Sequence, residues 1–125
     1  MIKSVSLIAI SSLALCMTAQ AVQFIHPLDF DNSLVQRKEV AAYIRYQVKE
    51  DYCNGAVDMC QPSMLRMMEN QNLSSFKKLM FAEDRKILDQ VIDTYCDGVL
   101  DMCSYFNLNM MYRTDLKASK KTLTW

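Results

Sequence analysis

A nine-residue stretch that occurs twice decides the fold: Tyr52-Cys53-Asn54-Gly55-Ala56-Val57-Asp58-Met59-Cys60 and Tyr95-Cys96-Asp97-Gly98-Val99-Leu100-Asp101-Met102-Cys103. The two stretches lie 43 residues apart, and at this offset positions 44–78 share 15 identities with positions 87–121. The only two glycines of the chain occupy equivalent positions. Self-similarity at a fixed period is typical of a duplicated supersecondary unit. We therefore predict two tandem repeats, at about 33–78 and about 79–121.

Apolar residues recur at helical spacing before each cysteine motif. Val40, Ile44 and Val48 lie four residues apart, after a capping box formed by Ser33 and Gln36. The second repeat carries a similar stripe, made of Ile87, Leu88, Val91, Ile92 and Tyr95. Segments rich in methionine and leucine follow each motif and predict a second helix in each repeat. The expected fold is all-α, a small disulfide-stapled bundle of four main helices in two helix hairpins. Segment 74–82 fits either a separate short helix or the start of the third long one.

The residues between the cysteines predict a tight corner in each repeat. Gly55 and Gly98 fall just after a helix, where a left-handed glycine commonly ends it. Asp58 and Asp101 then suit the N-cap of the following helix, which would place the second cysteine of each motif in its first turn. This structural role is preferred to a catalytic pair of aspartates, because both residues occupy the same place beside a helix start.

Four cysteines remain once an export signal is removed, an even number that is typical of disulfides in an oxidising compartment. In a continuous helix the two cysteines of a motif would lie about 10.5 Å apart, whereas a disulfide needs less than about 7 Å. A corner removes that obstacle. We predict Cys53–Cys60 and Cys96–Cys103, while links between the two repeats stay open as the alternative pairing.

Residues 1–21 read as the export signal. Lys3 precedes an apolar segment, and Ala19-Gln20-Ala21 matches a small-x-small cleavage site, so the mature chain is expected to begin at Val22. Cys16 would then be lost with the signal, because Leu15 does not suit a lipid-attachment motif. The mature part, 22–125, is expected to be a single helical domain in the periplasm, with secretion into the medium as the alternative.

Several classes of function are disfavoured by composition. The mature part holds 13 of the 14 basic residues and all 14 acidic ones, a net charge of −1 that gives no support for nucleic-acid binding. It contains no apolar run long enough to span a membrane. Its one histidine is His26, and no pattern for a catalytic triad or a phosphate-binding loop is present. We expect neither an enzyme nor a bound cofactor.

A soft-metal site is the competing hypothesis. Thiolate and thioether sulfurs select Cu(I), and the chain is rich in both cysteine and methionine. The ligands would be drawn from Cys53, Cys60, Cys96, Cys103, Met64, Met67 and Met110. Methionine also fills irregular helical cores, and the cysteine spacing is not that of a zinc site, so disulfides are preferred.

One local pattern resembles a known family. Gly55-x-x-Asp58 followed by Cys60-x-Pro62 is similar to part of a motif in small helical periplasmic immunity proteins, which neutralise effectors injected by rival bacteria. The resemblance covers about ten residues of one repeat, and the second repeat has Tyr105 in place of the proline. Small size, a disulfide-stapled fold and the absence of catalytic groups favour an exported binding protein that contacts another protein, as an inhibitor, an immunity protein or an accessory factor.

Overall fold

The computed structural model describes residues 22–99 and 101–125, which are helical throughout their regular parts. A short 3₁₀ turn, η1 (Pro27–Asp29), precedes four α-helices, and no β-strand occurs in these two ranges. The helices are α1 (Leu34–Cys53), α2 (Pro62–Leu79), α3 (Arg85–Cys96) and α4 (Tyr105–Ser119). The predicted all-α bundle is confirmed. The proposed signal at 1–21, including Cys16, and Leu100 lie outside the described residues.

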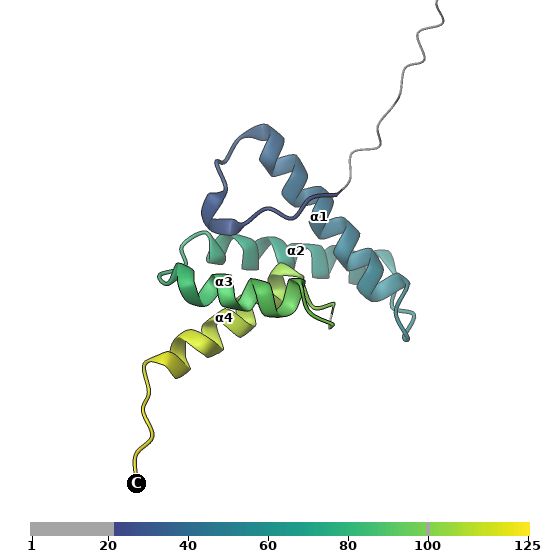
Figure 1. Cartoon of the computed structure of the whole chain (residues 1–125). Helices are drawn as coiled ribbons and strands as arrows, with labels where there is room; N and C mark the ends of the chain where they lie inside the picture. The colour runs from purple at the N-terminus through teal and green to yellow at the C-terminus, as the bar shows by residue number, and fades with distance from the viewer. Residues whose placement is uncertain (1–21, 100) are drawn as a thin grey trace, which may run out of the picture.

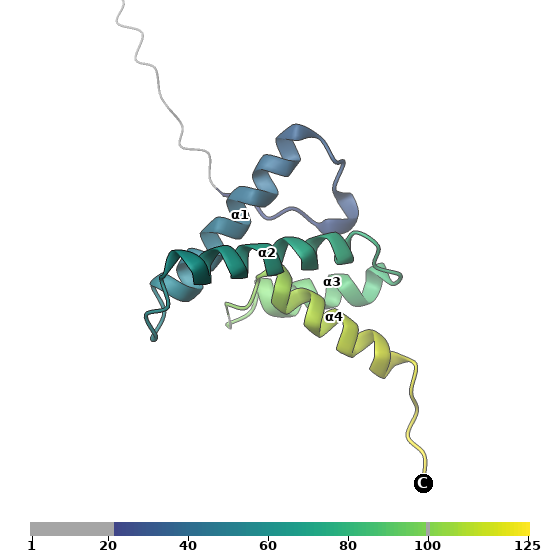
Figure 2. The ribbon, with the colours of Figure 1, turned by 180° about the vertical axis from the view of Figure 1, so that it is seen from behind.

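The helices pack in an order that differs from their order in the chain. α1 packs on α2, α2 packs on α4, and α4 packs on α3, so α2 and α4 form the centre (Figure 1). Both cysteine turns lie at one end of the molecule, and the turn from α2 to α3 lies at the opposite end, as the view from behind also shows (Figure 2). None of the described helices is long and apolar enough to cross a membrane.

Local sequence signals explain where the helices begin. The Ser33 hydroxyl accepts a hydrogen bond from the Gln36 amide, as the capping box predicts. In a capping box the Gln36 side chain would also accept from the Ser33 amide. Here it accepts from the Asp31 amide instead, two residues earlier in the chain. α2 begins with Pro62, whose missing N–H costs nothing at a first helical position.

The segment 74–82 follows neither of the two courses predicted for it. Residues up to Leu79 continue α2, and Asp84 then caps α3 by accepting a hydrogen bond from the Ile87 amide. α2 therefore ends at Leu79, one residue past the predicted end of the first repeat. Position 77, which is the counterpart of the start of α1 at the repeat offset, is still inside α2, so α3 is shorter than α1. The tandem repeat stays an interpretation of the sequence, because the two halves differ in this way.

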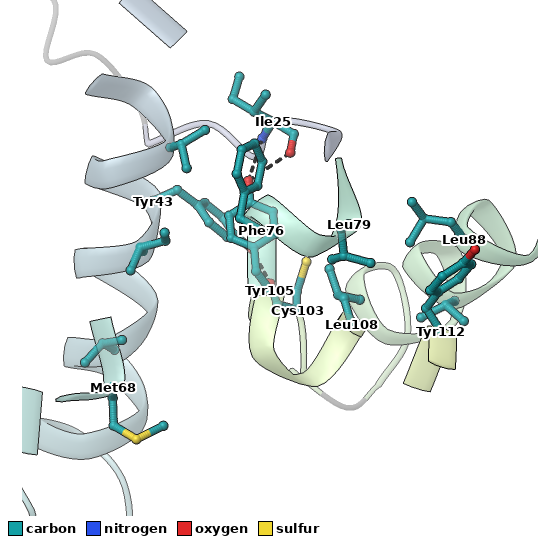
Figure 3. Close-up of a cluster of buried hydrophobic side chains, with 14 residues drawn as sticks. Ile25, Tyr43, Met68, Phe76, Leu79, Leu88, Cys103, Tyr105, Leu108 and Tyr112 are labelled. Atoms are coloured by element: carbon teal, nitrogen blue, oxygen red, sulfur yellow. Dashed lines mark hydrogen bonds between the residues drawn. The ribbon is translucent and has the colours of Figure 1, made fainter. Parts of the chain in front are cut away.

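The core joins the predicted stripes around an aromatic centre. Val40, Ile44 and Val48 of α1 are at most 4% exposed, and Leu88 and Val91 of α3 are at most 1% exposed. Tyr105 of α4 is fully buried, with its ring centroid 4.8 Å from that of Phe76 and 5.3 Å from that of Tyr43 (Figure 3). Side chains from α1, α2 and α4 thus meet at one point, which fixes how the three helices cross.

The N-terminal arm, residues 22–33, is bound to this core. The Tyr105 hydroxyl donates to the Ile25 carbonyl at 2.8 Å and accepts from the Ile25 amide at 3.2 Å (Figure 3). Arg85 of α3 makes two hydrogen bonds of 2.8 Å to the carboxylate of Asp29 in η1. The arm is therefore held from both α4 and α3, and it covers one side of α2.

Candidate functional site

The four mature cysteines form two local disulfides. Cys53 bonds to Cys60 and Cys96 bonds to Cys103, and in both pairs the Cα atoms lie 4.6 Å apart. This pairing confirms the prediction and excludes links between the repeats. Each turn also contains one backbone hydrogen bond of the same kind. The amide of the residue before the second cysteine donates to the carbonyl of the residue before the first cysteine. The length of this bond is 3.0 Å in the first turn and 3.4 Å in the second.

The prediction that a left-handed glycine ends each helix was wrong. Neither Gly55 nor Gly98 has a positive φ, so no left-handed residue ends either helix. A Cβ atom added to Gly55 would lie 2.7 Å from the backbone oxygen of Asp51, much closer than carbon and oxygen normally approach. Gly55 is therefore required because the chain passes very close to the last turn of α1, and not because of its φ angle.

The predicted capping role of the two aspartates was also wrong. α2 has Gln61 at its N-cap with no side-chain cap bond, and α4 is capped by Ser104, whose hydroxyl accepts from the Asn107 amide. Asp58 and Asp101 lie exposed in the turns, three residues before these caps. Cys60 and Cys103 likewise precede the helices instead of starting them. The disulfide holds each second cysteine against the end of the previous helix, so the next helix starts only after it.

A buried amide that the sequence analysis missed joins α2 to α4. Asn72 is 3% exposed, and its side-chain NH₂ donates to the Met68 carbonyl while its oxygen accepts from the Phe106 amide at 3.1 Å. The Phe106 amide is one of those at the start of α4 that no carbonyl within the helix can reach. The one available signal was a polar residue on the core-facing side of α2, four positions after Met68.

His26 anchors the arm to α3. Its Nδ1 accepts from the Leu28 amide at 3.1 Å, so the ring proton lies on Nε2, which donates to Asp89 at 2.7 Å. Asp89 also lies 3.8 Å from Arg85, which in turn binds Asp29. The Arg85 guanidinium holds the pKa of the Asp29 carboxyl below its usual value. These four side chains form one charged network that joins η1 to α3.

The cysteine and methionine sulfurs proposed as ligands of a soft metal differ in their bonding and in their exposure. All four cysteines are in disulfides, whose sulfurs do not act as thiolate ligands in the oxidised protein. Met64 packs against the core, whereas Met67 and Met110 are 47% and 43% exposed. Among residues 22–99 and 101–125, no three His, Cys, Asp or Glu side chains are grouped closely enough to hold a metal ion.

Acidic residues gather around the two disulfide turns, which lie at the same end of the molecule (Figures 1 and 2). They are Glu50, Asp51, Asp58, Asp93, Asp97 and Asp101. Asp51 is exposed as a residue, but partial burial of its carboxyl group raises the pKa, with further increases from the charges of Asp101 and Glu50.

Basic and apolar side chains gather instead along α2 and α4, where a shallow hollow separates the two helices. We call this surface the basic face and define it by Lys78, Phe106, Met110, Arg113 and Lys117. The four α4 residues are spaced by three or four positions, which places them on one side of the helix. Phe106 is 37% exposed and Met110 is 43% exposed. No carboxylate lines the hollow, and the three cations take part in none of the ion pairs found in the described parts of the chain.

Comparisons with protein families, curated proteins and solved structures gave no significant match to this chain.

Proposed function

We propose that this protein is an exported, non-enzymatic binding protein that acts by contact with another protein through the basic face. The observation that supports this proposal is the segregation of charge. The mature part is nearly neutral, yet three cations without ion-pair partners surround two exposed apolar side chains on one side of the helix pair. An inhibitor, an immunity protein and an accessory factor would all act in this way.

The composition of the basic face suits a protein interface. Aromatic residues, methionine and arginine are enriched at interfaces, and Phe106, Met110 and Arg113 supply one of each. The partner surface should carry carboxylates around an apolar centre, because opposite charges steer the encounter and suppress wrong partners. The buried Asn72 bridge joins α4 directly to α2, and the Cys96–Cys103 disulfide ties the start of α4 to the end of α3. Both restraints lower the entropy cost of ordering the face on binding.

We propose the periplasm as the place of action, with release into the medium as the other outcome of export. The sequence of residues 1–21 and the two disulfides support an oxidising compartment outside the cytoplasm. Fractionation of the native host, with an antibody against the mature part, tests this placement. Recovery of the protein in the cytoplasm with free thiols would contradict it.

Site-specific photo-crosslinking in the native host tests the binding proposal. A photoreactive phenylalanine analogue placed at Phe106 or at Met110 should give a discrete protein adduct, because both side chains are exposed at the centre of the face. The matched control is the same analogue at Tyr46, which is 49% exposed on α1 and outside the basic face. The adduct is then identified by mass spectrometry.

Charge reversal distinguishes a specific contact from non-specific crosslinking. The double variant Arg113→Glu, Lys117→Glu should abolish the adduct, because it turns attraction into repulsion. The double variant Lys38→Glu, Arg45→Glu makes the same change on exposed residues of α1 and should leave the adduct intact. Equal labelling from Tyr46, or an adduct that survives reversal on α4, would overturn the proposal.

A further inference from the structure

A separate hollow of about 590 Å³ lies between the N-terminal arm, α1 and α2. We call it the arm pocket, and its lining residues are Phe30, Asn32, Arg37, Val40, Ala41, Leu73, Phe76, Lys77, Met80 and Phe81. Its volume falls within the range of about 300–1,000 Å³ that is usual for small-molecule sites. The α1 residues Arg37, Val40 and Ala41 lie within one turn of helix, and the α2 residues repeat at three- and four-residue spacing, so each helix presents one side to the pocket.

The interior of the arm pocket is apolar and well supported. Val40 and Phe76 are each 2% exposed and form its inner wall. The edge of the Phe30 ring packs against the ring of Phe76, with their centroids 5.1 Å apart, so the arm fixes a second wall. Phe81 is 81% exposed and Leu73 is 37% exposed, which leaves apolar surface open to solvent beside the buried wall. An apolar ligand would cover side chains that the fold leaves uncovered.

Two cations from different helices lie at this pocket, and no aspartate or glutamate lines it. Arg37 is held in place by a hydrogen bond of 2.9 Å from its Nε to the Asn32 side chain. Asn32 has a left-handed backbone, with φ of 63°, at the point where the arm turns into α1. Neither Arg37 nor Lys77 belongs to an ion pair in the regions that the structure describes. Their charges are therefore available to a ligand.

We infer that the arm pocket binds a single-chain amphiphile with an anionic head, of the fatty-acid class. The hydrocarbon chain lies against Val40, Phe76 and Met80, and the carboxylate pairs with Arg37 and Lys77. A neutral apolar ligand would partly desolvate the two cations without compensation, whereas a carboxylate supplies charge-assisted hydrogen bonds. This site does not depend on the proposed protein contact at the basic face, and either can fail without the other.

Titration of the oxidised protein with sodium dodecanoate tests the inference. The probe is used below the concentration at which it forms micelles, and binding is followed by methyl NMR at Ala41, Leu73 and Met80. We expect one saturable site with shifts at these three methyl-bearing residues. Dodecyltrimethylammonium, which has the same chain and the opposite charge, should cause no saturable shift there. Equal binding of the two amphiphiles, or no saturable binding of dodecanoate, would overturn the inference.

Neighbouring lysines on α2 provide a matched pair of variants. Lys77→Glu should weaken dodecanoate binding by about tenfold or more, because it replaces a charge-assisted contact by repulsion. Lys78→Glu makes the same charge change one residue further on, outside the arm pocket, and should change the affinity less than about twofold. Arg37→Glu and Lys38→Glu repeat this comparison on α1. Circular dichroism shows whether each variant is folded, and equal losses within either pair would overturn the inference.

Discussion

Removal of one hydroxyl group, in Tyr105→Phe, should weaken the attachment of the N-terminal arm to the core, while the contacts of the arm with α3 remain. The ring itself stays in place and no cavity forms, so the change isolates the two hydrogen bonds to Ile25. Each such bond contributes about 0.5–1.5 kcal/mol, and an unpaired buried polar group costs about 1–3 kcal/mol. Tyr105 is fully buried and Ile25 is 8% exposed, so water cannot readily replace the hydroxyl. We expect the free energy of unfolding to fall by about 2–3 kcal/mol.

Urea unfolding followed by circular dichroism measures this loss, and hydrogen exchange at the Ile25 amide locates it. The matched control is Tyr46→Phe, whose hydroxyl makes no hydrogen bond within the described structure and whose side chain is 49% exposed. That variant should change stability by less than about 0.5 kcal/mol. If Tyr105→Phe loses no more stability than Tyr46→Phe, and the Ile25 amide stays protected, the hydroxyl does not hold the arm.

Three further predictions concern caps, the first turn and pH. Ser104→Ala should lower the free energy of unfolding by about 0.5–2 kcal/mol, because α4 loses its N-cap. Asp58→Ala should change it by less than about 0.5 kcal/mol, because Asp58 caps no helix. If thermal unfolding shows equal losses in the two variants, Asp58 does act as a cap. Gly55→Ala should destabilise the protein by about 1–3 kcal/mol, because the added methyl group meets a carbonyl oxygen at 2.7 Å, and an unchanged urea midpoint would contradict that geometry. Burial raises the pKa of the Tyr43 and Tyr105 phenols, so the folded state keeps protons that unfolded tyrosines release above about pH 10. Stability should therefore be unaffected by these groups below about pH 10 and fall as pH rises beyond it, with a smaller fall in Tyr43→Phe.

Local signals made much of the fold predictable. The period of Val40, Ile44 and Val48 gave a helix and its buried side, and Ser33 with Gln36 gave its start. Cysteine spacing around a glycine favoured the local disulfide pairing, because a corner in the chain brings residues seven positions apart within bonding distance. These features depend on neighbours in the chain, so a sequence displays them directly.

Features that depend on distant contacts escaped prediction. The Asn72 amide, the bond from His26 to Asp89 and the tether from Tyr105 to Ile25 each join residues 34 to 80 positions apart. Nothing in the local pattern of either partner shows which buried backbone group it will satisfy. The predicted starts of the helices that follow the two disulfides were also wrong. Each helix begins only after the second cysteine, and the local sequence pattern did not show how the disulfide holds that cysteine.

Both candidate surfaces depend on contacts between segments far apart in the chain. The arm pocket needs the arm against α2, and the basic face needs α4 against α2. The sequence showed the cations and the apolar residues but not which of them would lie side by side. Exposure also mattered, because Phe81 and Met110 look like core residues by type and are left uncovered by the packing.

The two disulfides are tested most directly by non-reduced peptide mapping of protein taken directly from the host compartment. Free thiols and copper are measured on the same sample. We expect a chain beginning at Val22, no free thiol, and two linked peptide pairs, Cys53 with Cys60 and Cys96 with Cys103. One or more equivalents of copper held by free thiols would contradict this expectation and support the soft-metal hypothesis. Links between the two repeats would contradict the hairpin arrangement itself.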